Sequence, residues 1–297
     1  MNSAEAFARY ESVRHRMPAA RPGGLGTKLD NLDALTDHID VFLLDAFGVL
    51  NVGETAIKGV PERVAGLQKM GKQIMVVSNA AGYPHAKLLE KYKKLGYNFA
   101  SENIITSRKT LLHALQNQPP MKWGLMATQS LGLGDIEPFN MVYLADEIAA
   151  YDAAEGFVLL GSAMWTEARQ ALLEASLKNA HRPIYVGNPD IVAPRERGLS
   201  IEPGYFAHQL ADRTGIEPLF FGKPFGNIFD LAFAHLTSVD FSRTLMVGDS
   251  LHTDILGGQA AGLKTALISN YGFFAGQDVE GPIAASGIQP DYILQRP

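Results

Sequence analysis

The stretch VFLLDAFGVL, residues 41–50, decides the fold prediction. Its first four residues are apolar without interruption, which is typical of a strand covered on both faces of a parallel sheet. This strand is expected to end at Asp45, and Gly48 follows in a short turn. Ligands of open parallel sheets bind beyond the carboxyl ends of the strands, so Asp45 is a candidate site residue.

The same arrangement recurs along the chain. Further apolar strands are predicted at 73–77, 244–247 and 264–268, with an edge strand at 290–294. Helical patterns lie between the strands, at 58–70, 84–95, 227–236 and 255–261. This alternation predicts an α/β fold with a Rossmann-like core and a central parallel sheet.

The middle of the chain predicts a second, smaller module. Between 115 and 210, a helix over 166–179 lies between strand-like runs at 156–160 and 183–186. We therefore predict an N-terminal extension over 1–27, a core built from 28–114 and 211–297, and an α/β cap inserted at 115–210. The extension contains a helical stretch at 4–16 and a hinge rich in proline and glycine.

The composition limits the classes of partner. The 297 residues are 46% hydrophobic and 19% charged, which suits a folded protein with a sizeable core. A net charge of -5 gives no reason to expect nucleic acid or a membrane surface as a partner. The chain has no cysteine, which excludes disulfides and thiolate chemistry. With no signal-like or membrane-spanning apolar run, we expect a cytoplasmic protein.

Four polar positions are predicted to meet at one edge of the sheet. Asp45, Ser78 and Asp249 each end a strand, and Lys223 follows the apolar run 219–221. Carboxylates hold a hard divalent cation and can attack phosphorus, while a hydroxyl and a lysine bind phosphoryl oxygens. Singly, each position is as well explained by a helix cap or a turn. Together they indicate phosphoryl transfer.

The order of the motifs resembles that of the haloacid dehalogenase (HAD) superfamily of hydrolases. The four stretches that carry the resemblance are DAFGVL at 45–50, VSN at 77–79, GKP at 222–224 and GDSLHTDILGG at 248–258. The insert after the second motif and the NPD sequence at 188–190 are similar to subclass IIA. That subclass contains NagD-type sugar and nucleotide phosphatases and pyridoxal phosphate phosphatase.

The resemblance implies a role for each matched residue. The nucleophile would be Asp45. The ligands of Mg²⁺ would be Asp45, the backbone carbonyl of Phe47 and Asp249, with Asp254 as a supporting or water-mediated partner. The phosphoryl group would be bound by Ser78, Asn79, Lys223 and the backbone around Phe47 and Gly48. Asn188 and Asp190 either face the substrate or form a plain turn.

One position departs from the family pattern. Family phosphatases usually carry a second aspartate two residues after the nucleophile, as acid and base, and this chain has Phe47 there. General acid–base help is worth about 10²–10⁴-fold. Three readings stay open: an enzyme that is slow or limited to good leaving groups, an enzyme in which another residue moves the proton, or a phospholigand-binding or regulatory protein with weak or no turnover. Candidates for the second reading are His252, His85 and Glu54.

The sequence as a whole predicts a magnesium-dependent phosphatase for small phosphorylated metabolites such as a sugar phosphate or a nucleotide. The cap is expected to select the substrate. Trp123 and Trp165 are expected to pack inside the cap rather than to line a lid. The oligomeric state stays open, a homodimer included.

Overall fold

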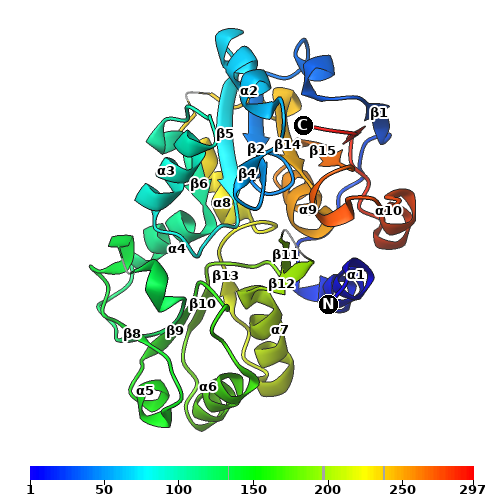
Figure 1. The fold of residues 1–297 in the computed structure, drawn as a ribbon. Coiled ribbons are helices and arrows are strands. Elements are labelled where there is room, and N and C mark those ends of the chain that lie inside the picture. Colours follow the sequence, from blue (N-terminus) through cyan, green and yellow to red (C-terminus); the bar gives the residue numbers. More distant parts are fainter. Residues whose placement is uncertain (133, 196–197, 237) are drawn as a thin grey trace.

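The chain forms two α/β units that meet around a cavity, with the core above and the cap below in Figure 1. The computed structural model describes residues 1–132, 134–195, 198–236 and 238–297. Each unit has its own parallel sheet. The predicted two-unit α/β fold with a Rossmann-like core is confirmed.

The core sheet has seven parallel strands in the order β1-β16-β15-β14-β2-β5-β6. In chain order these are β1 (Thr27–Leu29), β2 (Val41–Leu44), β5 (Gln73–Ser78), β6 (Ile104–Thr106), β14 (Thr244–Gly248), β15 (Lys264–Ile268) and β16 (Tyr292–Leu294). Strands β14 and β5 flank β2, so the ends of these three strands lie side by side. The edge strand predicted at 290–294 is wrong in one respect, because β1 adds outside β16 and forms the edge.

Helices cover both faces of the core sheet, which explains why its strands are apolar throughout. Phe42 and Leu44 pack with α2 (Val60–Lys69) and α3 (His85–Lys94) on one face. Val41 and Leu43 point the other way and pack with α8 (Gly226–Phe233). The other helices beside this sheet are α4 (Ser107–Leu115), α9 (Leu256–Ala260) and α10 (Glu280–Ser286). An antiparallel pair, β3 (Asn51–Val52) and β4 (Thr55–Ala56), follows the Asp45 turn.

The cap sheet has five parallel strands in the order β13-β10-β9-β7-β8. They are β7 (Trp123–Met126), β8 (Met141–Tyr143), β9 (Gly156–Leu159), β10 (Ile184–Val186) and β13 (Leu219–Phe220). The cap helices are α5 (Ile148–Asp152), α6 (Glu167–Asn179) and α7 (Pro203–Thr214). A separate antiparallel hairpin, β11 (Val192–Pro194) and β12 (Leu199–Ile201), lies between cap and core in Figure 1.

The cap extends further along the chain than the predicted boundary at residue 210. That boundary falls inside α7, which packs against α6, and β13 pairs with β10 of the cap sheet. The predicted boundary puts the apolar run 219–221 in the core. Its strand instead completes the edge of the cap sheet, and the chain returns to the core at Gly222–Pro224.

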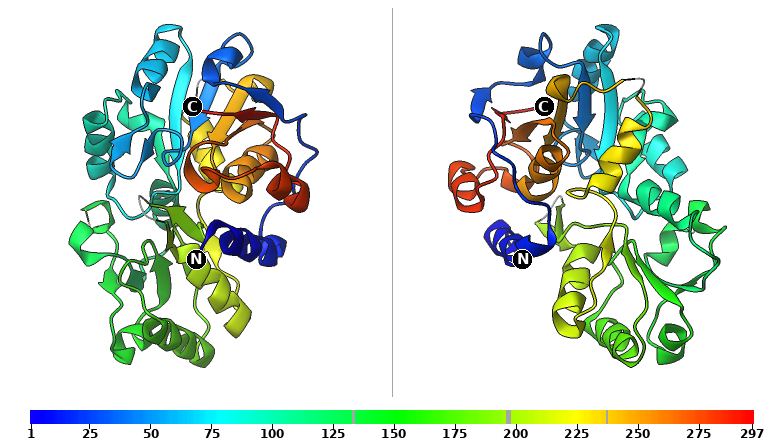
Figure 2. Two further views of the ribbon diagram at one scale, coloured as in Figure 1. Left: turned by 45° about the vertical axis from the view of Figure 1, so that its right-hand side comes forward. Right: turned by 180° about the vertical axis from the view of Figure 1, so that it is seen from behind.

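The N-terminal extension is ordered as a helix, α1 (Ser3–Ser12), followed by a stretch that runs back to β1. Figure 2 shows α1 beside the junction of cap and core. Of the described residues, no helix combines the length and apolar character that crossing a membrane requires.

Candidate active site

Three carboxylates meet where β2 and β14 end. Asp45 follows β2 and Asp249 follows β14, while Asp254 lies in the π-helical turn Leu251–Ile255 just beyond. One oxygen from each lies within 4.8 Å of the others, and all three side chains are buried. Asp254 Oδ2 accepts hydrogen bonds from the backbone N–H groups of Asp249 (3.1 Å) and Ser250 (3.0 Å), which fixes the turn.

Lys223 joins this cluster from the cap–core connection. Its Nζ donates to Asp45 Oδ1 at 2.7 Å and to Asp254 Oδ1 at 2.6 Å. The lysine is only 1% exposed. Burial acts to lower the pKa of Lys223, but the carboxylates of Asp254 and Asp45 raise it above its usual value, so the ammonium stays charged.

Glycines allow the backbone to close around Asp249. Gly48 and Gly272 have left-handed φ angles of 74° and 73°. A Cβ atom would lie 2.7 Å from Asp249 Oδ2 at Gly48 and 1.8 Å from it at Gly272. The same oxygen accepts a hydrogen bond of 2.7 Å from the backbone N–H of Phe273. Side chains at either glycine would displace this carboxylate.

The three carboxylates fit a divalent metal ion. Lys223 supplies one positive charge against three buried carboxylates, and burial raises the pKa of Asp249 well above its usual value, as do Asp254 and Asp45. Burial likewise raises the pKa of Asp254 to about 6, although Lys223 opposes this. Carboxylate oxygens whose negative charge is not fully balanced are the ligands that Mg²⁺ prefers. Both oxygens of Asp254 already accept protein hydrogen bonds, which suits the supporting role predicted for it.

Ser78 and Asn79 lie in the same cavity but differ in what their side chains can do. Among the described residues, the Ser78 hydroxyl accepts a long hydrogen bond of 3.3 Å from Ala80 N–H and donates none, so its proton is available to a ligand. The Asn79 side chain accepts from Lys223 N–H (2.8 Å) and donates to Lys223 O (2.9 Å) and Asp190 Oδ1 (2.7 Å). Asn79 therefore positions Lys223, and its side chain has no donor left for phosphate.

Asn188 and Asp190 both line the cavity from the cap side. Asn188 donates to Glu202 Oε2 at 3.1 Å, and Asn188 Oδ1 accepts from Asp190 N–H at 3.1 Å. Burial raises the pKa of Asp190 to about 8, although Asn79 opposes this. The Asp190 carboxyl is therefore largely protonated at neutral pH.

Phe47, two residues after Asp45, lines the cavity. Its turn is held by a hydrogen bond from Gly48 N–H to Asn51 O at 2.9 Å. The predicted metal contact of the Phe47 carbonyl stays a prediction.

The three proton donors suggested by the sequence do not line the cavity. His252 is buried and bonds to Glu11 at 2.5 Å, and burial lowers the pKa of His252 to about 4. His85 bonds to Ser101 Oγ, and Glu54 is an exposed partner of Lys91. Each of the three is held by another partner, although Lys91, the partner of Glu54, itself lines the cavity. None of the three candidates for a replacement acid is therefore placed at the cavity by the structure.

The two tryptophans pack within the cap, as expected. Trp123 is buried beside Tyr185, and Trp165 donates its ring N–H to Gln170 at 2.9 Å. Neither lines the cavity.

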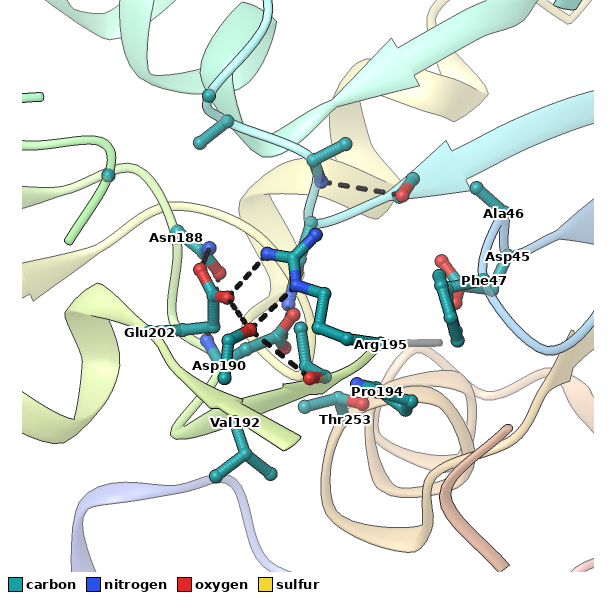
Figure 3. A pocket seen from close by; sticks show the side chains of 18 of the residues that line it. Asp45, Ala46, Phe47, Asn188, Asp190, Val192, Pro194, Arg195, Glu202 and Thr253 are labelled. Atoms are coloured by element: carbon teal, nitrogen blue, oxygen red, sulfur yellow. Dashed lines mark hydrogen bonds and ion pairs between the residues drawn. The ribbon is translucent and has the colours of Figure 1, made fainter. Parts of the chain in front are cut away.

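The cavity has a volume of about 470 Å³ and takes its lining from both units. Figure 3 shows Asn188 and Glu202 on the opposite side of the pocket from Asp45 and Phe47, with Arg195 between them. Arg195 donates to Glu202 Oε1 at 2.7 Å and to Ser200 Oγ at 2.7 Å. A pocket of this size suits a small metabolite.

Sequence reasoning missed several residues that line this cavity. They are Tyr10, Asn51, Tyr92, Arg195 and Glu202. The apolar stripe of the first helix was the available signal for Tyr10, and the charged run RER at 195–197 was the signal for Arg195. The other residues stand in no motif, and only the folded chain brings them to the site.

Comparison with known proteins identifies the family of this chain. The family model described as haloacid dehalogenase-like hydrolase matches residues 42–132, and a HAD hydrolase-like model matches residues 220–296. The chain is 28% identical to phosphoglycolate phosphatase 1A, chloroplastic, of Arabidopsis thaliana over 97% of this chain and 83% of that protein.

Solved structures show the same fold. A possible sugar phosphatase of the HAD superfamily from Cytophaga hutchinsonii matches with a TM-score of 0.80 at 24% identity, over 91% of this chain and 98% of that one. The glycerol phosphate phosphatase Rv1692 of Mycobacterium tuberculosis, in complex with magnesium, matches with a TM-score of 0.70 at 22% identity, over 88% of this chain and 76% of that one.

The two ranges matched by the family models include Asp45, Ser78, Lys223, Asp249 and Asp254. The chain therefore belongs to the haloacid dehalogenase superfamily and is a hydrolase of its phosphatase type, a class that uses Mg²⁺. Within that superfamily it belongs to subclass IIA, with the NagD-like phosphatases.

Proposed function

We propose that this protein hydrolyses small phosphomonoesters through an aspartyl-phosphate on Asp45, with Mg²⁺ as its metal. The observation that carries the proposal is the contact of one buried lysine with two carboxylates, Lys223 with Asp45 and Asp254, beside Asp249. This arrangement places a nucleophile, a fixed positive charge and a set of metal ligands at one point.

The reaction would proceed in two steps. An oxygen of Asp45 attacks phosphorus, the bond from phosphorus to the leaving oxygen breaks, and the leaving oxygen takes up a proton. Water then attacks the acyl phosphate, which releases phosphate and restores the Asp45 carboxylate. Lys223 holds Asp45 in place and offsets charge on the phosphoryl oxygens, and the Ser78 hydroxyl donates to one of them.

Asp45 and Asp249 would hold the metal ion directly, with Asp254 in support. When bound, Mg²⁺ offsets the negative charge of the phosphoryl group.

Two buried atoms of cavity-lining residues favour a substrate that carries hydroxyl groups. Tyr92 and Asn51 line the cavity, and their atoms Tyr92 Oη and Asn51 Oδ1 are buried with no hydrogen-bond partner among the described residues. Buried polar groups are normally paired, so a ligand that supplies the partners would be favoured. A sugar phosphate or a polyol phosphate fits this demand, and phosphoglycolate and glycerol phosphate phosphatases are among the relatives.

Asp190 is the candidate acid for the leaving group, in place of the aspartate that Phe47 replaces. It lines the cavity, and burial keeps its pKa near 8, so it carries a proton at neutral pH. Its carboxyl oxygen Oδ1 accepts a hydrogen bond of 2.7 Å from Asn79.

The direct test is turnover of a chromogenic aryl phosphate by the purified protein with Mg²⁺. We expect hydrolysis that is lost on chelation of the metal and in Asp45→Asn, which keeps the shape of the side chain. Hydrolysis that survives in Asp45→Asn would contradict the proposal.

Phe47 favours a second candidate function, a phospholigand-binding protein without turnover. This candidate predicts no hydrolysis of any phosphomonoester in a broad panel, together with magnesium-dependent binding of inorganic phosphate or tungstate. Such a result would replace the phosphatase proposal.

A further inference from the structure

The N-terminal helix α1 carries a stripe of side chains that belongs to one apolar cluster with residues of both units, among them Ile191 on the cap side and Ile255 on the core side. Ala6, Tyr10 and Val13 recur at helical spacing and are at most 2% exposed. The helix start is fixed by a capping box, in which Asn2 and Glu5 bond to each other's backbone N–H. The helix is therefore a preformed surface with one apolar face.

On the core side, α1 packs against the segment that carries Asp254. The Tyr10 ring stacks on His252 with 4.8 Å between ring centroids and 9° between planes, and Glu11 bonds to His252 Nε2 at 2.5 Å. Phe7 contacts the same imidazole edge-on at 5.2 Å. His252 lies two residues before Asp254, so α1 packs directly against the segment that supplies one of the three clustered carboxylates.

On the cap side, the same helix is held by polar contacts. Tyr10 Oη accepts a hydrogen bond of 3.0 Å from the backbone N–H of Ile191. Arg16 pairs with Asp212 at 2.6 Å and with Glu217 at 2.9 Å, and Arg9 pairs with Asp212 at 3.2 Å. Asp212 belongs to the cap helix α7.

Tyr10 thus touches both units through opposite ends of one side chain. Its ring lies on the core, and its hydroxyl holds the backbone directly after Asp190. Tyr10 also lines the cavity, together with Asn188 and Asp190. Figure 1 shows α1 at the junction of the two units, beside the hairpin β11–β12.

We propose that residues 1–17 form a strap that holds the cap against the core, and that Tyr10 is the positioning residue through which the strap fixes the turn Asn188–Ile191 at the active site. The strap itself does not depend on the proposed function. Only the expected change in KM and kcat rests on it. Since the core contacts are buried and aromatic while the ion pairs to α7 are partly exposed, the strap stays with the core and releases the cap when the cavity opens.

The test compares Tyr10→Phe with Tyr151→Phe. Tyr10→Phe keeps the ring stack on His252 and removes only the hydroxyl that accepts from Ile191. Tyr151→Phe is the matched control, because it removes the hydrogen bond of a buried tyrosine hydroxyl to Ala145 O inside the cap. Because the chain has no cysteine, spin labels can be placed at Lys69→Cys on α2 and Lys178→Cys on α6, both exposed. Double electron–electron resonance then reports the distance between core and cap.

We expect Tyr10→Phe to broaden the distance distribution toward longer values and to speed amide hydrogen exchange at Ile191. It should also raise KM about 5-fold while kcat changes less than 2-fold, by loss of about one buried hydrogen bond. Tyr151→Phe should leave the distribution and KM as in the unmodified protein. If Tyr10→Phe does not fold, the double variant Arg9→Gln/Arg16→Gln leaves Tyr10 in place and should broaden the distribution in the same way. It removes the cap-side ion pairs, the contact of Arg9 with the Tyr205 ring of the cap and a hydrogen bond of Arg9 to Ser12.

An unchanged distribution in both strap variants would overturn the proposal, whatever the activity of the protein. A broadened distribution in a protein without any phosphatase turnover would keep the strap and overturn the proposed function. The two ideas therefore fail separately.

Discussion

The two walls of the cavity are built in different ways. The core wall, Asp45, Ser78, Lys223, Asp249 and Asp254, is buried, and its charged groups bond to one another or to the backbone at the ends of adjacent strands. The cap wall, Asn188, Asp190, Arg195, Ser200 and Glu202, comes from one turn and one hairpin, and the Arg195 side chain is 56% exposed. The core wall is thus a fixed arrangement of buried charges, whereas the cap wall includes the exposed charged side chain of Arg195.

This difference predicts which substitutions should affect all substrates equally and which should affect some substrates more than others. A change in the core wall should weaken the reaction with every substrate, because it acts on the phosphoryl group that all substrates share. A change around the leaving group should reorder the substrates instead. Four substitutions, taken in order of decreasing expected effect, distinguish these outcomes.

The largest effect is expected for Lys223→Met. Methionine is close in length but leaves Asp45 and Asp254 buried without their cation. We expect a loss of about 10²–10³-fold in kcat with all substrates and a loss of about 3–5 kcal/mol in the free energy of unfolding. Urea unfolding with and without Mg²⁺ measures the stability, and the metal should restore part of it. The partly exposed pair Lys72–Asp40 offers the control: Asp40 is also paired with Arg243, so Lys72→Met should change little.

The next effect concerns Phe47→Asp, which restores a carboxyl beside the leaving group. We expect the rate with alkyl phosphates to rise by about 10–100-fold and the rate with aryl phosphates to rise much less, because only poor leaving groups need the proton. Phe47→Asn is the matched control without a proton to give. An equal rise for both substrate classes would mean that residue 47 does not lie near the leaving group.

A smaller effect is expected from removing the Tyr92 hydroxyl, which has no hydrogen-bond partner among the described residues. Tyr92→Phe should raise KM for polyol and sugar phosphates by about 5–10-fold and leave KM for an aryl phosphate unchanged. Tyr97→Phe is the control, because the Tyr97 hydroxyl already donates to Leu50 O at 2.5 Å. Steady-state kinetics with the two substrate classes decide the matter. A loss shared equally by both classes would argue against a hydroxyl subsite.

The smallest effect is a change in the pH profile. Burial raises the pKa of Asp190 to about 8, so the protonated donor predominates at neutral pH and is lost as the pH rises through about 8. The rate with alkyl phosphates should fall across that range. Asp190→Asn still accepts the hydrogen bond from Asn79 but cannot give a proton, so its profile should be flat there at a lower rate. If the rate of Asp190→Asn still fell across that pH range, another titrating group would be its cause.

Three residues of the core wall, Asp45, Ser78 and Asp249, were predictable from sequence because they lie at strand ends. Parallel strands bring their carboxyl ends to one edge, so Asp45, Ser78 and Asp249 were predicted together from three separate apolar runs. Lys223 was predicted at the site for a partly wrong reason, since the strand before it belongs to the cap sheet.

The cap wall and the strap were not predictable in the same way. Tyr10 and Arg195 reach the site through tertiary packing of a helix and a hairpin, and no local pattern fixes where such elements dock. Asn79 shows the same limit, because its motif predicted phosphate binding while its neighbours Lys223 and Asp190 occupy its side chain.

The central claim is that Asp45 becomes phosphorylated. The most direct measurement is an acid quench of the enzyme during turnover with Mg²⁺ and an aryl phosphate, followed by mass spectrometry of the peptide that contains Asp45. The account predicts one phosphoryl group on Asp45, absent in Asp45→Asn and when the metal is chelated. Steady hydrolysis with no modified peptide, or with the phosphoryl group on another residue, would contradict it.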